Sequence, residues 1–238
     1  MLSASKTVAA ISTITPGALP PWFLLATEVT IEAKSFGRGP LGSVFRGVLS
    51  STPVVVKFFR TDDVVADVGM LLKLEKELNL LYEMNHPNLV KILGACHVSL
   101  PPFIVYEDIP SGNLSSFLAR SDDNKQQMWG KLHQAAIGLE YIHKRGLVHG
   151  DLKLSNILVS RSGQVKLTDF GLNVLRAFYS SSQTTLRWSS PECLKRRPTF
   201  ASDVYSLAMC IVEAVTGEPP FAFLGDDDFR DLLRNGGV

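Results

Sequence analysis

Two short polar segments lie close together in the second half of the chain and limit what it can fold into. The first is residues 148–156, VHGDLKLSN, and the second is residues 168–171, TDFG. Between them, apolar residues 157–159 and 164–167 flank a Ser162-Gly163 turn, which predicts two short strands joined as a hairpin. That hairpin would hold the carboxylates of Asp151 and Asp169 close to the amide of Asn156. Such an arrangement suits a proton acceptor beside a divalent cation.

The order H-G-D-L-K-L-S-N and then D-F-G resembles the catalytic and metal-binding loops of eukaryotic protein kinases. The resemblance extends from about Glu28 to the C-terminus. It implies an α+β, bilobal fold with a small antiparallel β-sheet and one regulatory helix in the N-lobe, and a mainly helical C-lobe that lacks its last helices. The expected division is a linker or docking segment at 1–27, an N-lobe at 28–109 and a truncated C-lobe at 110–238.

Composition and charge narrow the possible partners. The formal net charge of +1 gives no general attraction to nucleic acid or to membrane surfaces. No uninterrupted apolar run has the length of a membrane span, so direct membrane insertion is not expected. The three cysteines have no metal-binding spacing, which favours a reducing, cytoplasmic setting, either for a free protein or for the intracellular part of a larger or membrane-attached one. The sequence does not indicate an oligomeric state.

A glycine-rich stretch at residues 37–44, GRGPLGSV, has the spacing G-x-G-x-x-G-x-V. Glycines permit a tight turn and let backbone N–H groups approach phosphate oxygens, although an ordinary glycine-rich hairpin explains the stretch equally well. A dinucleotide-binding fold would need a helix directly after the third glycine, whereas residues 44–49 read as a strand. The resemblance implies that nucleotide is bound by Gly37, Gly39, Gly42 and Val44.

A lysine lies near the middle of the β-branched run at residues 53–59. Lys57 is either an ordinary lysine at a sheet edge or, by the resemblance, the residue that contacts the α- and β-phosphates. The helical period of residues 68–84 follows, and it carries Glu75 and Glu77. The family spacing back from the His86 turn selects Glu77 as the partner of Lys57, and we expect Glu75 to be solvated.

The resemblance also assigns the remaining site residues. Asp151 would accept the hydrogen bond of the substrate hydroxyl, Lys153 would neutralise the γ-phosphate, and Asn156 with Asp169 would hold Mg²⁺. Thr185 matches a threonine that helps shape a serine/threonine acceptor site. The other residues that would contact ATP are Val55, Glu107, Ile109, Leu158 and Asp169. Residues 107–109 would form the hinge, whose backbone holds adenine. Tyr106 would lie at the back of the adenine pocket. A tyrosine at this position is a feature in which the chain resembles the interleukin-receptor-associated kinases, and it indicates the tyrosine-kinase-like group.

Other periodic segments predict supporting elements. Strands are expected at 89–95 and 103–107, and helices at 128–144, 199–215 and 226–234. Asp203 is either a simple helix-start acid or, by the resemblance, the group that braces the catalytic loop. Gly150 stands where most kinases have an arginine that receives an activation-loop phosphate, so we expect activity without phosphorylation of residues 180–184.

Three functional hypotheses follow. The first is an ATP-dependent protein kinase that phosphorylates serine or threonine hydroxyls of protein substrates in intracellular signalling. The second is a truncated, non-catalytic kinase-like module that binds nucleotide or partner proteins. A small-molecule kinase is a weaker third hypothesis, because the segment from D-F-G to S-P-E at residues 190–192 is typical of a peptide-acceptor site.

Overall fold

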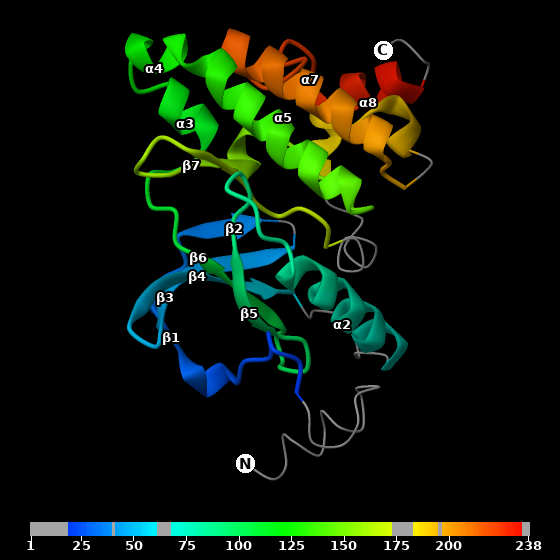
Figure 1. Cartoon of the computed structure of the whole chain (residues 1–238). Coiled ribbons are helices and arrows are strands. Elements are labelled where there is room, and N and C mark those ends of the chain that lie inside the picture. The colour runs from blue at the N-terminus through cyan, green and yellow to red at the C-terminus, as the bar shows by residue number, and fades with distance from the viewer. Residues whose placement is uncertain (1–18, 40, 61–67, 173–182, 195–196, 235–238) are drawn as a thin grey trace. The chain divides into compact units, whose positions relative to one another are not determined.

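The computed structural model describes residues 19–39, 41–60, 68–172, 183–194 and 197–234 (Figure 1). They form two compact units, with 19–85 and 91–108 in the first, and 86–90, 109–171 and 183–234 in the second; Leu172 is grouped with the first. Residues 86–90 belong to the second unit, although the predicted N-lobe included them. The reason is that Leu89 bridges to Leu167, while Val90 N donates to the Leu167 carbonyl at 2.8 Å.

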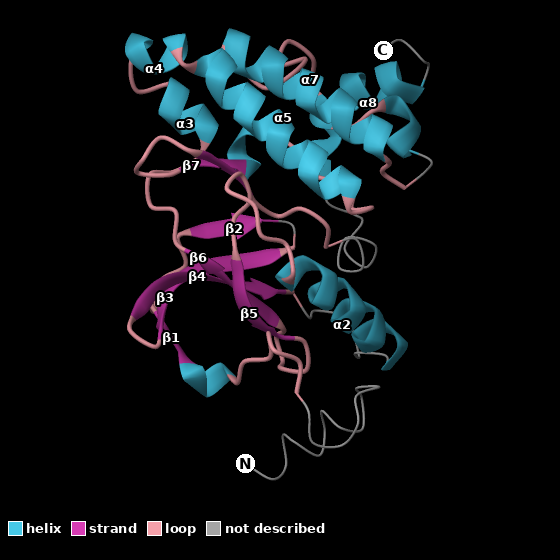
Figure 2. Ribbon diagram, viewed as in Figure 1, coloured by secondary structure: helices cyan, strands magenta, loops and turns pink. Residues whose placement is uncertain are grey.

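The first unit is built on a six-stranded antiparallel sheet with the order β1-β3-β4-β6-β5, in which β2 pairs with β3 (Figure 2). Its strands are β1 (Val29–Ile31), β2 (Gly37–Gly39), β3 (Gly42–Leu49), β4 (Thr52–Phe59), β5 (Ile92–Cys96) and β6 (Phe103–Glu107). The 3-10 helix η1 (Ala26–Glu28) precedes the sheet, and helix α2 (Val68–Tyr82) packs against β5. The predicted helix at 68–84 and the predicted strands at 53–59 and 103–107 are therefore confirmed.

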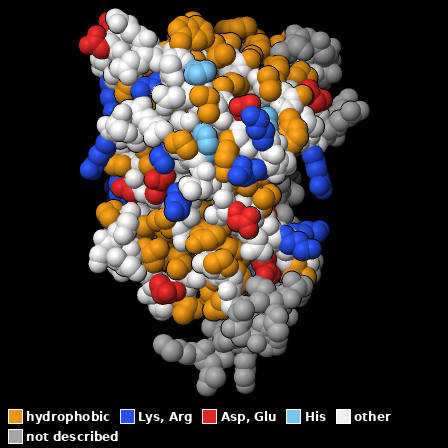
Figure 3. All heavy atoms as spheres, in the orientation of Figure 1, with side chains coloured by type: hydrophobic (Ala, Val, Ile, Leu, Met, Phe, Trp, Pro, Cys, Tyr) orange, Lys and Arg blue, Asp and Glu red, His pale blue; other side chains and the backbone are white. Residues whose placement is uncertain are grey.

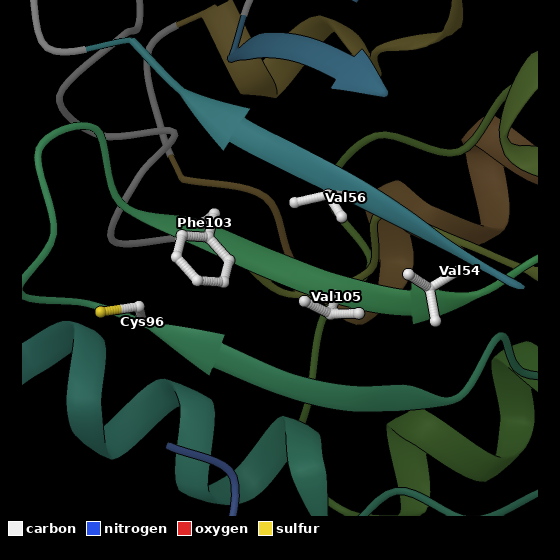
Figure 4. Packing of buried hydrophobic residues seen from close by; sticks show 5 residues of the cluster. All are labelled: Val54, Val56, Cys96, Phe103 and Val105. Atoms are coloured by element: carbon white, nitrogen blue, oxygen red, sulfur yellow. The ribbon is translucent and has the colours of Figure 1, made fainter. Parts of the chain in front are cut away.

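Alternation along the strands creates a buried face of this sheet. Val54 and Val56 of β4 lie on the same side as Phe103 and Val105 of β6, because side chains two residues apart share a face. Cys96 of β5 completes the cluster (Figure 4). The opposite side of β4 therefore carries Val55 and Lys57.

A segment upstream of η1 packs on the same unit. Trp22 is 1% exposed, and its indole N–H donates to Asn79 Oδ1 on α2 at 2.6 Å. Its carbonyl accepts from Ala95 N at 2.7 Å, and the Ala95 carbonyl accepts from Leu24 N at 2.9 Å. The Trp22 ring lies edge-on to His97 at 5.3 Å, and burial lowers the pKa of that histidine to about 4. Residues 22–24 thus extend the edge of the sheet beside β5.

The second unit is mainly helical. Its helices are α3 (Leu114–Leu118), α4 (Asp122–Gln126), α5 (Met128–Lys144), α7 (Phe200–Thr216) and α8 (Asp226–Arg234), with 3-10 segments η2 (Leu154–Asn156), η3 (Gln183–Trp188) and η4 (Pro191–Leu194). Strands β7 (Ile157–Val159) and β8 (Val165–Leu167) form the predicted hairpin beside α5. Helix α7 begins at a Thr199 capping box and ends at Gly217, whose φ of 76° is the left-handed conformation that glycine adopts easily.

One strand boundary differs from the prediction. The strand expected at 89–95 begins at Ile92 instead, because Leu89 and Val90 are already paired with Leu167 of β8. The first residues of the apolar run therefore pair with β8, and the later ones form β5. The hydrophobicity of the run alone does not show where this change of partner occurs.

Charged side chains of both signs lie on one face of the described residues (Figure 3). On the face drawn in Figure 3, basic and acidic side chains lie among one another, in keeping with the formal charge of +1. Within the part of the chain that the structure describes, no helix combines the length and apolarity needed to cross a bilayer.

Candidate functional site

The predicted phosphate-contacting lysine shares a sheet face with two valines that are predicted to contact the nucleotide. Val44 of β3 is paired directly with Lys57 of β4, and residues paired across antiparallel strands lie on one face. Val55, two residues before Lys57, points the same way and is paired with Tyr106 of β6. Lys57 is buried, and Val44 and Val55 are half-buried. The first unit therefore brings together four of the residues that the resemblance selected.

The glycine-rich stretch forms the hairpin of β2 and β3. Phe36 N donates to the Val44 carbonyl at 3.0 Å, and Gly39 is paired with Gly42 at the closed end. A Cβ on Gly42 would fall 1.8 Å from the Phe58 carbonyl oxygen, so only glycine fits there. Because β3 continues to Leu49, a helix does not follow the third glycine, and the dinucleotide-binding alternative is excluded. Pro40 lies outside the described residues.

A cavity of about 550 Å³ lies elsewhere in this unit. Its lining includes Phe45 of β3 and Phe58 of β4, which directly follow Val44 and Lys57 in the chain and whose rings lie 5.7 Å apart. Neighbouring residues on a strand point to opposite faces, so this cavity is on the other side of the sheet from Lys57. It is not the predicted nucleotide site.

The prediction that Glu75 is solvated is wrong, because helix α2 buries that side chain to 3% exposure. Glu75 lies four residues after Leu71 and three before Leu78, so it falls on the buried leucine face. Glu77 lies off this face and is half-buried. A buried carboxylate needs a charged or hydrogen-bonding partner. Glu75 is therefore a second candidate partner for Lys57, and pairing of Lys57 with Glu77 stays a prediction.

The segment predicted to be the hinge has both acidic side chains held in place. Glu107 Oε1 accepts from Lys91 N at 2.8 Å, and Asp108 Oδ2 lies 2.9 Å from Arg46 Nη1. Ile109, the next residue, is half-buried and belongs to the second unit. The predicted contacts of Glu107 and Ile109 with adenine stay predictions.

In the second unit, the loop after α5 sets Asp151 and Asn156 against one another. Asn156 Nδ2 donates to Asp151 Oδ2 at 3.0 Å and to the Asp151 carbonyl at 2.7 Å. Lys153 Nζ lies 3.6 Å from Asp151 Oδ1. Both Asp151 and Asn156 are buried, so the carboxylate has a fixed direction. These are the residues that sequence reasoning selected as the proton acceptor and its neighbours.

The two ends of the predicted hairpin are also fastened together. Thr168 N donates to the Asn156 carbonyl at 3.0 Å, and Gly171 N donates to the Val148 carbonyl at 3.2 Å. Asp169 has a φ of 61°, a conformation that is costly for a residue with a side chain and that recurs at functional sites. The loops that carry Asp151 and Asp169 are therefore neighbours, as the sequence predicted.

The donor set can be compared with what a divalent cation requires. Among the described residues, no group of three or more His, Cys, Asp or Glu side chains is arranged to hold a metal. The predicted ligands, Asn156 and Asp169, both offer oxygen, which Mg²⁺ prefers, and Mg²⁺ commonly takes few protein ligands alongside phosphate and water. Since Asn156 Nδ2 is committed to Asp151, the amide oxygen is the atom of Asn156 that can serve as a ligand.

A buried carboxylate braces this loop from α7. Asp203 is 1% exposed; its Oδ2 accepts from His149 N at 2.7 Å, and its Oδ1 accepts from Gly150 N at 2.9 Å. His143 Nε2 lies 2.8 Å from the same Oδ2. The brace implied by the resemblance is therefore confirmed. Gly150 itself has a φ of 74°, which an arginine at that position would adopt only at a cost.

We expect the Asp203→Asn variant to lose about 10²-fold in kcat, the effect of a misplaced catalytic group. Its amide keeps one acceptor oxygen but turns an NH₂ group toward one of the two backbone N–H groups, of His149 and Gly150, that now donate to the carboxylate. A buried donor left unsatisfied costs about 1–3 kcal/mol. The measurements are phosphotransfer rate and thermal unfolding, with Asp231→Asn on the exposed side of α8 as the matched control. Wild-type rates in Asp203→Asn would contradict this role.

Sequence reasoning missed two groups in this unit. His149 is fully buried, and its ring lies edge-on to Phe170 at 6.4 Å. Glu213 Oε2 accepts from Leu154 N at 3.1 Å and from Trp188 Nε1 at 2.9 Å, and burial raises the pKa of Glu213. The available signal for Glu213 was that it is the lone acid in the apolar stretch from 204 to 216.

The remaining predicted positions are Thr185, the phosphorylation candidates at 180–184, and Leu158. Thr185 belongs to the backbone of η3, but its side chain is not among those described. Of the phosphorylation candidates at 180–184, residues 180–182 lie outside the described residues. Leu158 is half-buried on β7, where it forms an isolated bridge with Asn113.

Comparisons with known proteins agree with this arrangement. Residues 30–238 match the family described as protein tyrosine and serine/threonine kinase. The chain is 37% identical over 84% of its length to the probable serine/threonine-protein kinase drkD of Dictyostelium discoideum, of which it covers 16%. It is 33% identical over 86% of its length to mitogen-activated protein kinase kinase kinase 1a of Physcomitrium patens, covering 27% of that protein.

A tyrosine kinase is also among the relatives. The chain is 30% identical over 94% of its length to the tyrosine-protein kinase transforming protein Fps of an avian sarcoma virus, and covers 44% of that protein. It thus spans less than half the length of each of these relatives. The braced Asp151 loop, the glycine hairpin beside Lys57 and the match over residues 30–238 lead to one conclusion: this chain belongs to the protein tyrosine and serine/threonine kinase family.

Proposed function

We propose that this chain is an ATP- and Mg²⁺-dependent protein kinase that phosphorylates serine or threonine hydroxyls of protein substrates, in the cytoplasm and as part of intracellular signalling. The observation that carries the proposal is the orientation of Asp151. Its Oδ2 is held at 3.0 Å by Asn156, and its Oδ1 lies 3.6 Å from the Lys153 ammonium.

Asp151 acts on the acceptor hydroxyl in the proposed reaction. The hydroxyl donates a hydrogen bond to the carboxylate and its oxygen attacks the γ-phosphorus of ATP. The bond from that phosphorus to the bridging oxygen breaks, ADP leaves with the electron pair, and the hydroxyl proton passes to Asp151. Lys153, two residues further on, places a positive charge beside the carboxylate and toward the transferred group.

The remaining site residues bind and orient. In the proposal, Lys57 positions the α- and β-phosphates, and the backbone of the glycine hairpin approaches them closely. Val44 and Val55 cover one side of the adenine, because they share the sheet face of Lys57. Mg²⁺, when held by Asn156 and Asp169, supplies charge neutralisation on the phosphates.

Serine/threonine specificity has its own support within the proposal. Lys153 stands at a position where tyrosine kinases usually have other residues, and Thr185 matches the threonine associated with a serine/threonine acceptor site. Relatives of both specificities match the chain, so specificity needs a direct test.

The test is transfer of radiolabelled phosphate from ATP to three peptides that differ only in having serine, threonine or tyrosine as the acceptor. We expect label on the serine and threonine peptides, little on the tyrosine peptide, and none when EDTA removes Mg²⁺. Label mainly on tyrosine would overturn the specificity. Nucleotide binding without transfer to any peptide would favour the alternative, a non-catalytic kinase-like module that binds nucleotide or partner proteins.

A further inference from the structure

One side chain on the nucleotide face of the sheet contacts two separate segments of the proposed site. Arg46 Nη1 lies 2.9 Å from Asp108 Oδ2, and the Arg46 guanidinium carbon lies 5.1 Å from the centre of the Phe36 ring. Asp108 is in the segment predicted to hold adenine. Phe36 directly precedes Gly37, the first residue of the glycine hairpin. The Arg46 guanidinium therefore contacts both the predicted adenine-binding segment and the start of the glycine hairpin.

Arg46 lies on the same sheet face as the residues proposed to bind the nucleotide. Arg46 is paired with Val55 across β3 and β4, and it lies two residues from Val44 on the same strand. It therefore shares the face of Lys57. The Asp108 side chain is only 16% exposed, whereas that of Arg46 is 39% exposed, so the pair lies at the margin of this face.

The neighbouring backbone is ordered on both sides of the arginine. Phe36 N donates to the Val44 carbonyl at 3.0 Å, which ties the start of the hairpin to β3. On the other side, Glu107 exchanges hydrogen bonds with Lys91 through its backbone N, at 3.0 Å, and its Oε1, at 2.8 Å. The Arg46 contacts add a side-chain link between these two anchored strands.

We propose that Arg46 is a positioning residue for nucleotide binding, which holds Asp108 and Phe36 in one arrangement before the nucleotide arrives. The inference rests on the proposed function. A site that is already ordered loses less conformational freedom on binding, so its affinity is higher. A partly exposed ion pair adds little to folding stability, so the main effect is on nucleotide binding and not on unfolding.

The experiment compares Arg46→Ala and Arg46→Lys with the wild-type chain, and with Arg161→Ala as a matched control at an exposed position of the second unit. The measurements are KM for ATP, KM for the acceptor peptide, kcat and the unfolding temperature. We expect Arg46→Ala to raise KM for ATP about three- to tenfold, with kcat, KM for peptide and the unfolding temperature close to those of Arg161→Ala. Arg46→Lys keeps the charge but not the flat guanidinium over Phe36, so its KM should be intermediate.

The outcomes separate this inference from the proposed function. A wild-type chain that transfers phosphate, together with an Arg46→Ala variant whose KM for ATP equals that of Arg161→Ala, overturns only the role of Arg46. A fall in unfolding temperature with both KM values raised together also overturns it, because the residue would then be merely structural. A wild-type chain that does not bind ATP overturns the proposed function and this inference with it.

Discussion

The Asp151→Asn variant is expected to transfer phosphate about 10²- to 10⁴-fold more slowly than the wild-type chain, the range for loss of a positioned proton acceptor. The reason lies in the contacts of the carboxylate. Asn156 Nδ2 donates to Oδ2, so an amide at residue 151 must turn its oxygen toward Asn156. Its NH₂ group then replaces Oδ1, the atom 3.6 Å from Lys153, and cannot accept the hydrogen bond of a substrate hydroxyl.

The measurement is autophosphorylation with Mg²⁺ and ATP, followed by peptide phosphorylation for rates. Asp123→Asn, an exposed acid on α4, is the matched control and should keep the wild-type rate. Asp151→Asn should still bind ATP, because in the proposal nucleotide binding is carried by other residues. Equal signals from the wild type and Asp151→Asn would defeat the enzyme hypothesis and leave the non-catalytic module.

Local sequence patterns predicted the backbone around Asp151 and Asp169 well. The hairpin of β7 and β8 follows from two apolar runs around a glycine turn, and a hairpin that short leaves Asp151 and Asp169 little freedom to separate. Residues paired across β3 and β4 likewise place Val44 beside Lys57. These features depend on contacts between residues that are close in sequence, which a pattern can encode.

Features that depend on tertiary packing were harder to predict. The family spacing selected Glu77 as the predicted partner of Lys57. Only the orientation of α2 showed that Glu75 lies on the buried face of that helix. The separation of Leu89 from β5 depends on Leu167, a partner 78 residues away. Glu213 could be recognised as a bridge only after Leu154 and Trp188 had been placed beside α7. In each case a distant partner decides the outcome.

The packing of Trp22 is the clearest example of such a distant partner. The sequence predicts a linker or docking segment at residues 1–27, and the family match begins only at residue 30. Nevertheless, Trp22 is among the largest fully buried side chains, bonded to Asn79 on α2 and edge-on to His97 after β5. Leu24 belongs to the same contact, since a Cβ on Gly94 would fall 2.3 Å from Leu24 Cδ1.

Replacing Trp22 with alanine is expected to lower the free energy of unfolding by about 3–5 kcal/mol, as for other fully buried tryptophans. The change removes the indole from between α2 and His97 and leaves Asn79 Oδ1 without its donor. The measurement is urea unfolding followed by circular dichroism. Trp129→Ala makes the same substitution at a site that is 60% exposed, and it should change stability by no more than about 0.5 kcal/mol.

The comparison of the two tryptophans decides whether the folded unit begins before residue 30. If Trp22→Ala unfolds at the same urea concentration as Trp129→Ala, the upstream segment adds nothing to the stability of the sheet. If only Trp22→Ala is destabilised, the kinase unit includes residues that the family match leaves out. An Asn79→Ala variant then separates the hydrogen bond from the packing: losing the bond alone should cost about 1 kcal/mol, well below the loss expected for the whole indole.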